Sequence, residues 1–398
     1  MSQFEFFDHL FRTSLVRLIA PLLLVRFGAL ISPRIGHFAG NTELYLCEQD
    51  AGINVPKMRY VDIFYCQSWP PVCNEQLARM WKRILHVWPS WILAPMVRIN
   101  RLIPGGARHE VGSNTQQDRD IYHLHERFPA HLTFSPDEER RGETGLRLMG
   151  IPVGVPFVCL NVRDNAYLDA HSPNDWSYHN YRDSDIQNYV MAAESLANRG
   201  YFVIRMGAKV RAPLQTSHKQ IIDYATNGSR SDFMDIYLGA KCEFCISVGS
   251  GFDAIPAVFR RPVVFVNQVP FAHFFTTSSN FLGITKHHFF ENEGRELTLS
   301  EIFSSGAAFF ESTAEFESRG IKLLENTPDE IHEVVIEMVD RLNQGFRPSF
   351  HDSDMQQKFW TIYKAGLAGT LVNGNPLHGE IRAQFGAAFL RNNPKWVA

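Results

Sequence analysis

The sequence is poor in cysteine, has no excess of basic residues and lacks a hydrophobic run long enough to cross a membrane. Its 398 residues include six cysteines, too few for a disulfide-held scaffold, so we expect a reducing compartment. Lysine and arginine total 39 against 42 aspartates and glutamates, and the formal net charge is -3. This balance offers no basic surface to a phosphate backbone, and we expect no nucleic-acid partner.

Residues 1–33 form an amphipathic lead rich in phenylalanine and leucine. Its longest uncharged apolar run, 18–25, is far shorter than the roughly 20 residues of a membrane span. Two acidic residues precede that run, unlike the basic start of a signal peptide. The lead can lie in the membrane interface with Arg12, Arg17 and Arg26 on anionic head groups, or it can pack on the protein's own core. We expect a cytoplasmic protein in peripheral contact with the cytoplasmic membrane.

Short apolar runs rich in β-branched and aromatic residues alternate with helical patterns along the rest of the chain. Strands are predicted at 43–48, 61–66, 156–163, 201–207, 242–248 and 262–267. Helices are predicted at 74–88, 183–200, 231–240, 249–261 and 327–344, with two helical patches around 352–366 and 377–391. This alternation predicts an α/β fold with parallel sheets covered by helices. We expect one domain over 34–150, a second over 151–345, and terminal helices over 346–398.

A glycine turn follows the predicted strand at 242–248. Glycines allow close backbone approach to a ligand, and the N-terminus of the helix that follows is a favourable place for an anion. In an open α/β sheet the ligand binds at this carboxyl edge of the strands. We therefore predict that a phosphate-bearing ligand contacts Ser247, Gly249, Ser250, Gly251 and Asp253; a purely structural turn is the alternative.

The same turn matches the dinucleotide fingerprint G-x-G-x-x-A through Gly249, Gly251 and Ala254. However, the next predicted strand ends in Asn267, where an acidic residue would bind the ribose. The match also lies two-thirds of the way along the chain rather than in its first strand–helix–strand unit. Both features count against a nicotinamide or flavin enzyme, and we expect no cofactor.

Two other predicted strands end in arginine. Arg163 ends the run at 156–163, and Arg205 lies two residues before Gly207 at the end of 201–207. Two guanidiniums aimed into one crevice would clamp a diphosphate through paired charge-assisted hydrogen bonds, with Gly207 beside them. Either arginine alone is more typical of a structural ion pair, for example with Asp164 or Asp185.

The sequence shows no pattern typical of a metal site. No D-x-D run follows a strand, so we expect no metal ligands and a diphosphate neutralised by arginine and the helix dipole. Cys242 and Cys245 lie in a strand pattern with no second pair, which favours buried thiols. The histidines at 123, 125 and 131 lack a carboxylate or cysteine context in the sequence. We interpret them as surface or hydrogen-bonded residues.

Five segments together resemble a known family: 34–48 (RIGHFAGNTELYLCE), 160–168 (LNVRDNAYL), 178–189, 202–207 and 247–267. Over most of its length the chain resembles bacterial glycosyltransferases of the GT-B type that act in surface-polysaccharide biosynthesis. Arg163 also resembles the arginine of the H-x-R motif of fucosyltransferase-like enzymes, although Asn161 stands where that motif has histidine. The resemblance implies two Rossmann-like domains facing a cleft, with the donor mainly on the second domain and the acceptor mainly on the first. It also implies that the C-terminal helices return to the first domain.

The predicted function is metal-independent transfer of a sugar from a UDP-, GDP- or CMP-linked donor to a cell-surface glycan or lipid-linked acceptor. Arg163, Arg205, Ser250 and Gly251 would hold the departing diphosphate. A sugar-nucleotide epimerase of the same fold is one alternative. A non-catalytic nucleotide-sugar-binding subunit of a glycan-assembly complex is another.

Inverting transfer also needs a general base at the acceptor hydroxyl. Gly36 and Gly40 bracket His37 in a stretch that precedes the first strand or opens the first helix. Histidine titrates near the working pH, so His37 is a candidate base, with Glu43 as its rival. The two glycines and Asn41 would contact the acceptor. A capping or core histidine is the alternative.

Overall fold

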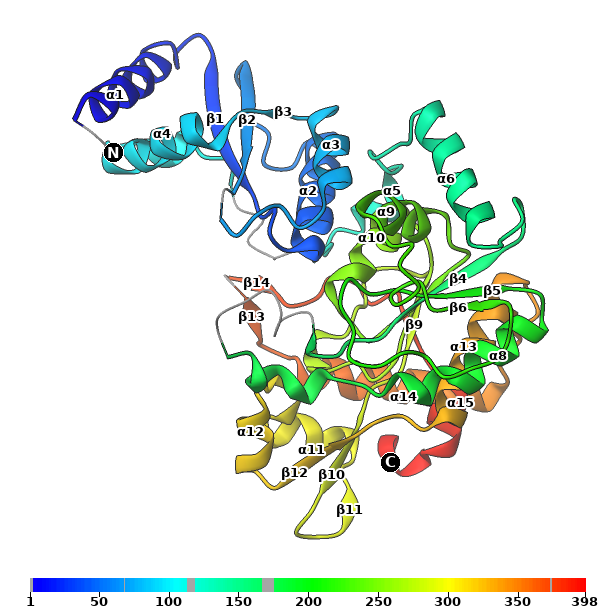
Figure 1. The fold of residues 1–398 in the computed structure, drawn as a ribbon. Helices are drawn as coiled ribbons and strands as arrows, with labels where there is room; N and C mark the ends of the chain where they lie inside the picture. The colour runs from blue at the N-terminus through cyan, green and yellow to red at the C-terminus, as the bar shows by residue number, and fades with distance from the viewer. Residues whose placement is uncertain (1–2, 68, 113–118, 167–174, 373) are drawn as a thin grey trace. The chain divides into compact units, whose positions relative to one another are not determined.

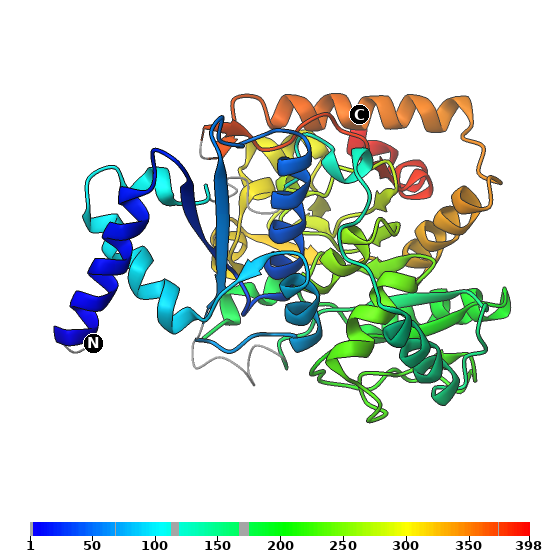
Figure 2. The same cartoon turned by 90° about the horizontal axis from the view of Figure 1, so that it is seen from above.

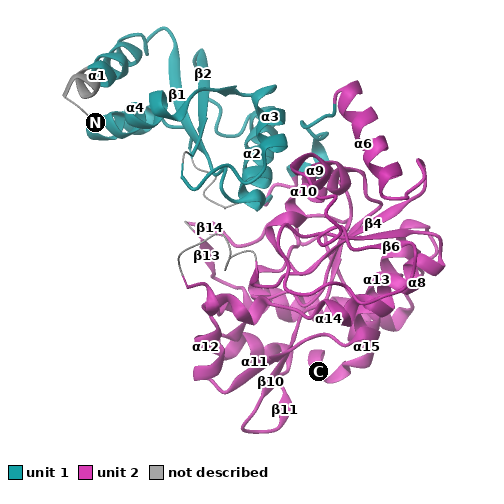
Figure 3. Ribbon diagram, in the orientation of Figure 1, with its two compact units in different colours: residues 1–120, 124–134 teal, residues 121–123, 135–398 magenta. Residues whose placement is uncertain are grey.

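The computed structural model describes residues 3–67, 69–112, 119–166, 175–372 and 374–398, with side chains from residue 8 onward (Figure 1). The chain divides into two compact units (Figure 3). Unit 1 holds residues 1–120 and 124–134, and unit 2 holds residues 121–123 and 135–398. Each unit contains a parallel sheet with helices, so the predicted α/β class is confirmed. Within the described chain, no helix combines the length and hydropathy that a membrane crossing requires.

Unit 1 is built on a three-stranded parallel sheet in the order β1-β2-β3. Its elements are α1 (Gln3–Leu18), β1 (Leu24–Leu30), α2 (Ile35–Asp50), β2 (Tyr60–Cys66), α3 (Glu75–Lys82), β3 (His86–Val87), α4 (Ser90–Leu102), η1 (Gly106–His109) and α5 (Leu124–Arg127). Strands β1 and β2 pair over their full length, from Leu24 opposite Tyr60 to Leu30 opposite Cys66. Side chains of β1 and α4 form the apolar core between sheet and helix.

The helix predicted at 74–88 is shorter than expected, because α3 ends at Lys82 and β3 follows, and one predicted strand is wrong. The segment 43–48 lies inside α2 instead of forming a strand. It contains no β-branched residue, and a helix places Leu44 and Cys47 together against Leu124 of α5. In the second half of the amphipathic lead, β1 is a buried strand of the sheet, so this half follows the alternative of packing in the protein's own core.

Unit 2 is built on a seven-stranded parallel sheet in the order β15-β9-β8-β7-β4-β5-β6. The strands are β4 (Phe157–Asn161), β5 (Phe202–Arg205), β6 (Ile221–Ile222), β7 (Cys245–Ser247), β8 (Val263–Phe265), β9 (Phe281–Gly283) and β15 (Gln384–Phe385). The four strands predicted between 156 and 267 are confirmed as β4, β5, β7 and β8. Their contiguous apolar runs are typical of strands that are covered on both faces.

Helices and two small antiparallel ladders complete unit 2 (Figure 2). The α-helices are α6 (Pro136–Leu148), α8 (Val190–Asn198), α9 (Asp232–Lys241), α10 (Ala254–Val258), α11 (Leu299–Ser304), α12 (Thr313–Ser318), α13 (Pro328–Leu342), α14 (Phe350–Gly366) and α15 (Ala387–Asn392). The 3₁₀ turns are η2 (Ser177–Arg182), η3 (Ile186–Tyr189), η4 (Gly251–Asp253), η5 (Phe271–His273), η6 (Ala307–Phe309) and η7 (Pro394–Val397). The ladders are formed by β10 (His287–Phe290), β11 (Arg295–Glu296) and β12 (Ile321–Leu324), and by β13 (Leu371–Val372) and β14 (Asn375–Pro376).

The borders of unit 2 differ from the expected domain limits. Helix α6, which the sequence analysis assigns to the first domain, packs on α9 of unit 2, with Gly142 close to the Tyr237 ring. The C-terminal segment packs within unit 2: α14 lies against α11, and β15 adds a strand to the large sheet. The return of the terminal helices to the N-terminal domain stays a prediction.

Candidate functional site

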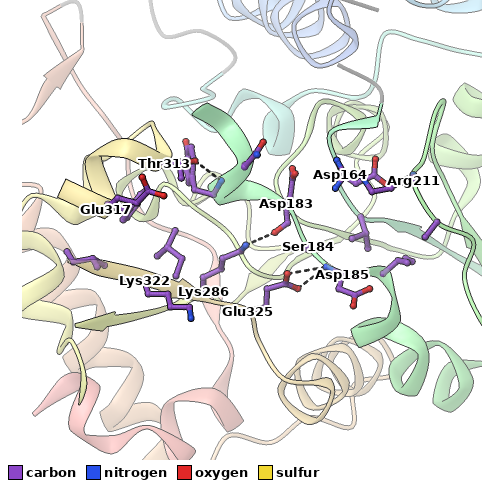
Figure 4. A pocket seen from close by; sticks show the side chains of 18 of the residues that line it. Asp164, Asp183, Ser184, Asp185, Arg211, Lys286, Thr313, Glu317, Lys322 and Glu325 are labelled. Atoms are coloured by element: carbon purple, nitrogen blue, oxygen red, sulfur yellow. Dashed lines mark hydrogen bonds between the residues drawn. The ribbon is translucent and has the colours of Figure 1, made fainter. Parts of the chain in front are cut away.

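A cavity of about 560 Å³ lies at the carboxyl edge of the large sheet in unit 2 (Figure 4). Three of its wall residues lie at or just beyond strand ends: Val162 follows β4, Arg205 ends β5, and Lys286 lies three residues beyond β9. Residues of α12 and β12 form another part of the wall. Parallel α/β sheets bind their ligands at this edge, so the cavity is the candidate ligand site.

The walls of the cavity carry charges of both signs. The basic residues are Arg205, Arg211, Lys286 and Lys322, and the acidic residues are Asp164, Asp183, Asp185, Glu317 and Glu325. Such a lining suits a ligand that has both anionic groups and hydroxyl donors, because ammonium and guanidinium groups bind phosphate oxygens while carboxylates accept from hydroxyls.

Arg205 lines the cavity from the end of β5, and only 1% of its surface is exposed to solvent. Its Nη1 lies 3.1 Å from Asp223 Oδ1, and its Nη2 donates to the carbonyl oxygen of Ala212 at 3.1 Å. Among the described residues, no acceptor bonds the buried Nε of Arg205. Arg205 is therefore both a structural ion-pair partner, with Asp223 rather than Asp164 or Asp185, and a cavity residue with one donor left over.

Arg163 does not line the cavity, although β4 and β5 are neighbours in the sheet. Its Nε lies 3.4 Å from Asp183 Oδ1, and its Nη2 donates to Asn165 Oδ1 at 3.3 Å. Burial, followed by the nearby Arg182, lowers the pKa of Arg163. Arg163 is thus paired with the wall residue Asp183. The structure does not bring Arg163 together with Arg205 on the cavity wall.

Asp183 is a wall residue with a strongly perturbed acidity. Burial raises its pKa to about 6, and the charges of Arg163 and Lys286 oppose that rise. Lys286 Nζ donates to the backbone oxygen of Asp183 at 2.5 Å, and burial lowers the pKa of Lys286 (Figure 4). A carboxyl group that titrates near neutrality on a cavity wall is a typical feature of a functional site.

Side chains of the protein itself form hydrogen bonds with polar groups of the glycine turn. Ser250 N–H donates to Asp253 Oδ2 at 2.6 Å, and Ser247 Oγ donates to the same oxygen at 3.0 Å. Asn161 Nδ2 donates to Ser250 Oγ at 2.6 Å, and the Arg182 guanidinium donates to the Gly249 oxygen. Asp253 thus accepts from two of the groups predicted to bind a phosphate, Ser250 N–H and Ser247 Oγ.

The helix beyond the turn is also shorter than predicted. It consists of η4 and the five-residue α10, and no residue from 247 to 253 lines the cavity. Gly249 has φ +73°, a left-handed conformation that favours glycine. Gly207 lies in a tight loop, where a Cβ atom would come within 2.5 Å of Val210 Cγ1. Phosphate binding by the turn and by Gly207 stays a prediction.

The predicted acceptor residues lie in unit 1, all on α2. Gly36 and Gly40 fall within this helix, and His37 Nδ1 lies 3.2 Å from Asn41 Oδ1, one turn further on. His37 is half-buried, and burial lowers its pKa, which favours the neutral imidazole. Neutral imidazole is the form that accepts a proton.

Glu43, the rival base, is fully buried. Its Oε1 lies 3.2 Å from His131 Nδ1, at hydrogen-bond distance. This hydrogen bond is the main cause that raises the pKa of His131. Of the two base candidates, only His37 is partly open to solvent.

The interpretation of His131 as lacking a carboxylate context is wrong, because Glu43 and Asp50 flank its ring. Chain folding brings these residues together across more than 80 positions.

Several wall residues were missed by sequence reasoning. Asp183 lies in the polar and aromatic stretch 178–189, which carried the family resemblance but was given no role. Lys286 follows the three-residue strand β9, which is too short to be recognised from a pattern. Arg211 lies in a loop after β5 and gives no sequence signal of its own.

No protein-family model and no curated protein matches this chain. Solved structures with a similar chain path include the family 9 glycosyl transferase from Veillonella parvula DSM 2008, with 9% identity and a TM-score of 0.46. Another is the ADP-heptose LPS heptosyltransferase II of E. coli, with 15% identity and a TM-score of 0.42. Each alignment covers 80% of this chain and 98% of the other. At this level of similarity we base no conclusion about activity on these structures.

Proposed function

We propose that this chain is a glycosyltransferase whose nucleotide-sugar donor binds in the cavity of unit 2. The observation that carries the proposal is the combination of a carboxyl-edge cavity with interleaved basic and acidic walls. The diphosphate would accept from Arg205 and Lys286, and the sugar hydroxyls would donate to the carboxylates. A volume of about 560 Å³ falls in the usual range of small-molecule sites.

In the proposed reaction an acceptor hydroxyl oxygen forms a bond to the anomeric carbon of the donor. The bond from that carbon to the phosphate oxygen breaks, and the nucleoside diphosphate (the nucleoside monophosphate for a CMP-linked donor) leaves with the electron pair. Arg205 and Lys286 would stabilise the charge on the leaving group without a metal ion. His37 of unit 1 is the proposed base for the hydroxyl proton, because burial lowers its pKa and so favours the neutral form. The proposed acceptor is a cell-surface glycan or a lipid-linked glycan at the cytoplasmic membrane.

Lys286→Met should weaken donor binding by roughly tenfold to a hundredfold, since a hydrogen bond from a charged group contributes about 1.5–3 kcal/mol. Calorimetry of the full-length protein with UDP-, GDP-, CMP- and ADP-linked sugars would measure this, each with and without Mg²⁺. Lys358→Met is the matched control, because Lys358 is half-exposed on α14 and pairs with Asp354 outside the cavity. If no donor binds, or if the Lys286 variant binds as the native protein does, the proposed site is wrong.

Turnover then distinguishes the proposal from its two alternatives. A transferase consumes the bound donor only when a glycan or lipid-linked acceptor fraction is added. An epimerase converts the donor sugar with no acceptor present. A non-catalytic subunit binds the donor and converts it under neither condition.

Donor affinity should also fall as the pH rises through about 6. Asp183 is neutral below its raised pKa and carries a negative charge above it, and that charge repels the bound diphosphate. We expect a loss of about tenfold, roughly 1.4 kcal/mol, between the two forms. An intact nucleotide sugar is the right probe, because it carries no terminal phosphate that titrates in the same range.

The variant that checks this pH dependence is Asp183→Asn. Its affinity should be nearly independent of pH between about pH 5 and pH 7.5, the interval in which Asp183 changes charge. A slope in the asparagine variant equal to that of the native protein would assign the effect to another group.

A further inference from the structure

Three side chains of the kinds that bind zinc meet in unit 1. Glu43 and Cys47 lie one turn apart on α2, and His131 follows α5. Glu43 Oε1 lies 3.2 Å from His131 Nδ1 and 3.8 Å from Cys47 Sγ, and the three ligand atoms are all within 4.8 Å of one another. In tetrahedral zinc sites, metal–ligand distances of about 2.0–2.3 Å separate neighbouring ligand atoms by about 3.3–3.6 Å. The two separations from Glu43 Oε1 to the other ligand atoms are therefore close to those of a zinc site.

The second nitrogen of His131 is held as in a metal-bound histidine. His131 Nε2 lies 3.0 Å from Asp50 Oδ2, on the opposite side of the ring from Glu43 and Cys47. A histidine that binds a metal through one nitrogen commonly donates its other N–H to a carboxylate. The backbone N–H of His131 also donates to Glu43 Oε1 at 3.3 Å, which orients that carboxylate. The Asp50 contact thus orients the His131 ring, and the backbone contact orients the Glu43 carboxylate.

The buried carboxylate of Glu43 favours a positive charge beside it, which the His131 ring or a bound cation can supply. Glu43 and Cys47 are fully buried, and their helix packs through Leu44 on Leu124 and Phe128. A buried carboxylate is costly unless a positive charge compensates it. His131 remains partly exposed, so an ion can enter on its side.

We propose that Glu43, Cys47 and His131 bind a zinc ion in unit 1, with Asp50 as a positioning residue. The mixed oxygen, sulfur and nitrogen ligands suit Zn²⁺ better than Mg²⁺ or Ca²⁺, which prefer oxygen ligands. Binding releases the Cys47 thiol proton and the proton on His131 Nδ1, and a water molecule completes the four positions. The ion links the segment after α5 to α2. This inference is independent of the proposed donor site, which lies in unit 2.

The test uses the full-length protein and two measurements. Metal analysis should find one zinc per chain, either as purified or after addition of zinc and removal of the excess. Cobalt titrated into the chelator-treated protein should give a thiolate-to-cobalt charge-transfer band in the near ultraviolet. Cys47→Ser should remove that band, whereas Cys66→Ser, a half-buried cysteine on β2 of the same unit, should retain it.

A second variant keeps the test decisive if Cys47→Ser does not fold. Asp50 is exposed, and Asp50→Asn should lower cobalt affinity by about 10–100-fold, the usual cost of losing such a carboxylate. Absence of metal binding overturns the proposal. So does a charge-transfer band that Cys66→Ser removes and Cys47→Ser keeps, or a cobalt affinity that neither Cys47→Ser nor Asp50→Asn changes.

Discussion

Arg26→Met should lower the free energy of unfolding of unit 1 by about 3–5 kcal/mol, because it leaves a buried carboxylate without its partner. Arg26 Nε lies 2.7 Å from Asp62 Oδ1, and Arg26 Nη2 lies 2.6 Å from Asp62 Oδ2. Tyr45 donates its hydroxyl to Asp62 Oδ2 at 2.6 Å. Both charged residues are less than a tenth exposed. Hydrogen exchange of the β1 and β2 amides would measure the change within this unit alone.

Two further variants control this prediction. Arg26→Met combined with Asp62→Leu should recover much of the stability, since replacing both members of a buried pair is often nearly neutral. Arg12→Met removes an exposed pair with Asp8 and should change stability by no more than about 1 kcal/mol. A single Arg26 variant as stable as the native protein would show that the buried ion pair is not formed.

This ion pair changes the interpretation of the N-terminal lead. Arg26 is not available to lipid head groups, and β1 belongs to the sheet. Arg17 also turns toward the protein, where its guanidinium donates to the Asn100 side chain and to the Ile103 oxygen at 3.4 Å. Of the three arginines in the lead, Arg12 is the one that forms an exposed ion pair, with Asp8. A truncation that tests the lead must therefore end before Leu24, because a longer one removes a strand.

The strands of unit 2 were predictable because of their local composition. The runs at 156–163 and 262–267 are contiguous, apolar and rich in valine, and a parallel sheet covered on both faces requires such runs. The same logic placed Arg205 at the carboxyl edge of the sheet, and Lys286, which the sequence did not indicate, lies at that edge as well.

What could not be predicted depends on contacts between distant segments. Asp183, Lys286 and Lys322 share a cavity although up to 139 positions separate them (322 minus 183), and no local pattern reports such proximity. The partners of His131 lie on α2, which the sequence analysis read partly as a strand. The periodicity of a short apolar segment does not distinguish strand from helix, and the packing of Leu44 and Cys47 decided it.

Helix α1 exposes an apolar stripe that we expect to bind a membrane interface. Phe11, Leu15 and Leu18 recur at helical spacing, and their exposed fractions are 69%, 51% and 77%; Leu22, just beyond the helix, is 82% exposed. Transfer of one such side chain out of water contributes about 1.5–3 kcal/mol, so Leu15→Ser combined with Leu18→Ser should weaken liposome binding by about a hundredfold or more. Sedimentation of the full-length protein with anionic liposomes would measure the loss.

The matched control replaces two exposed leucines of unit 2 in the same way. Leu148 and Leu371 are 83% and 60% exposed, so Leu148→Ser with Leu371→Ser removes as many leucine side chains while leaving the stripe intact. Both double variants should bind the nucleotide sugar with native affinity, because none of the four leucines lines the cavity proposed for the donor. If the α1 double variant no longer sediments with the liposomes and the control variant still does, the stripe makes the membrane contact. Equal sedimentation of the α1 variant and the native protein would refute it, and an acceptor held in the membrane would then have to be reached through another surface.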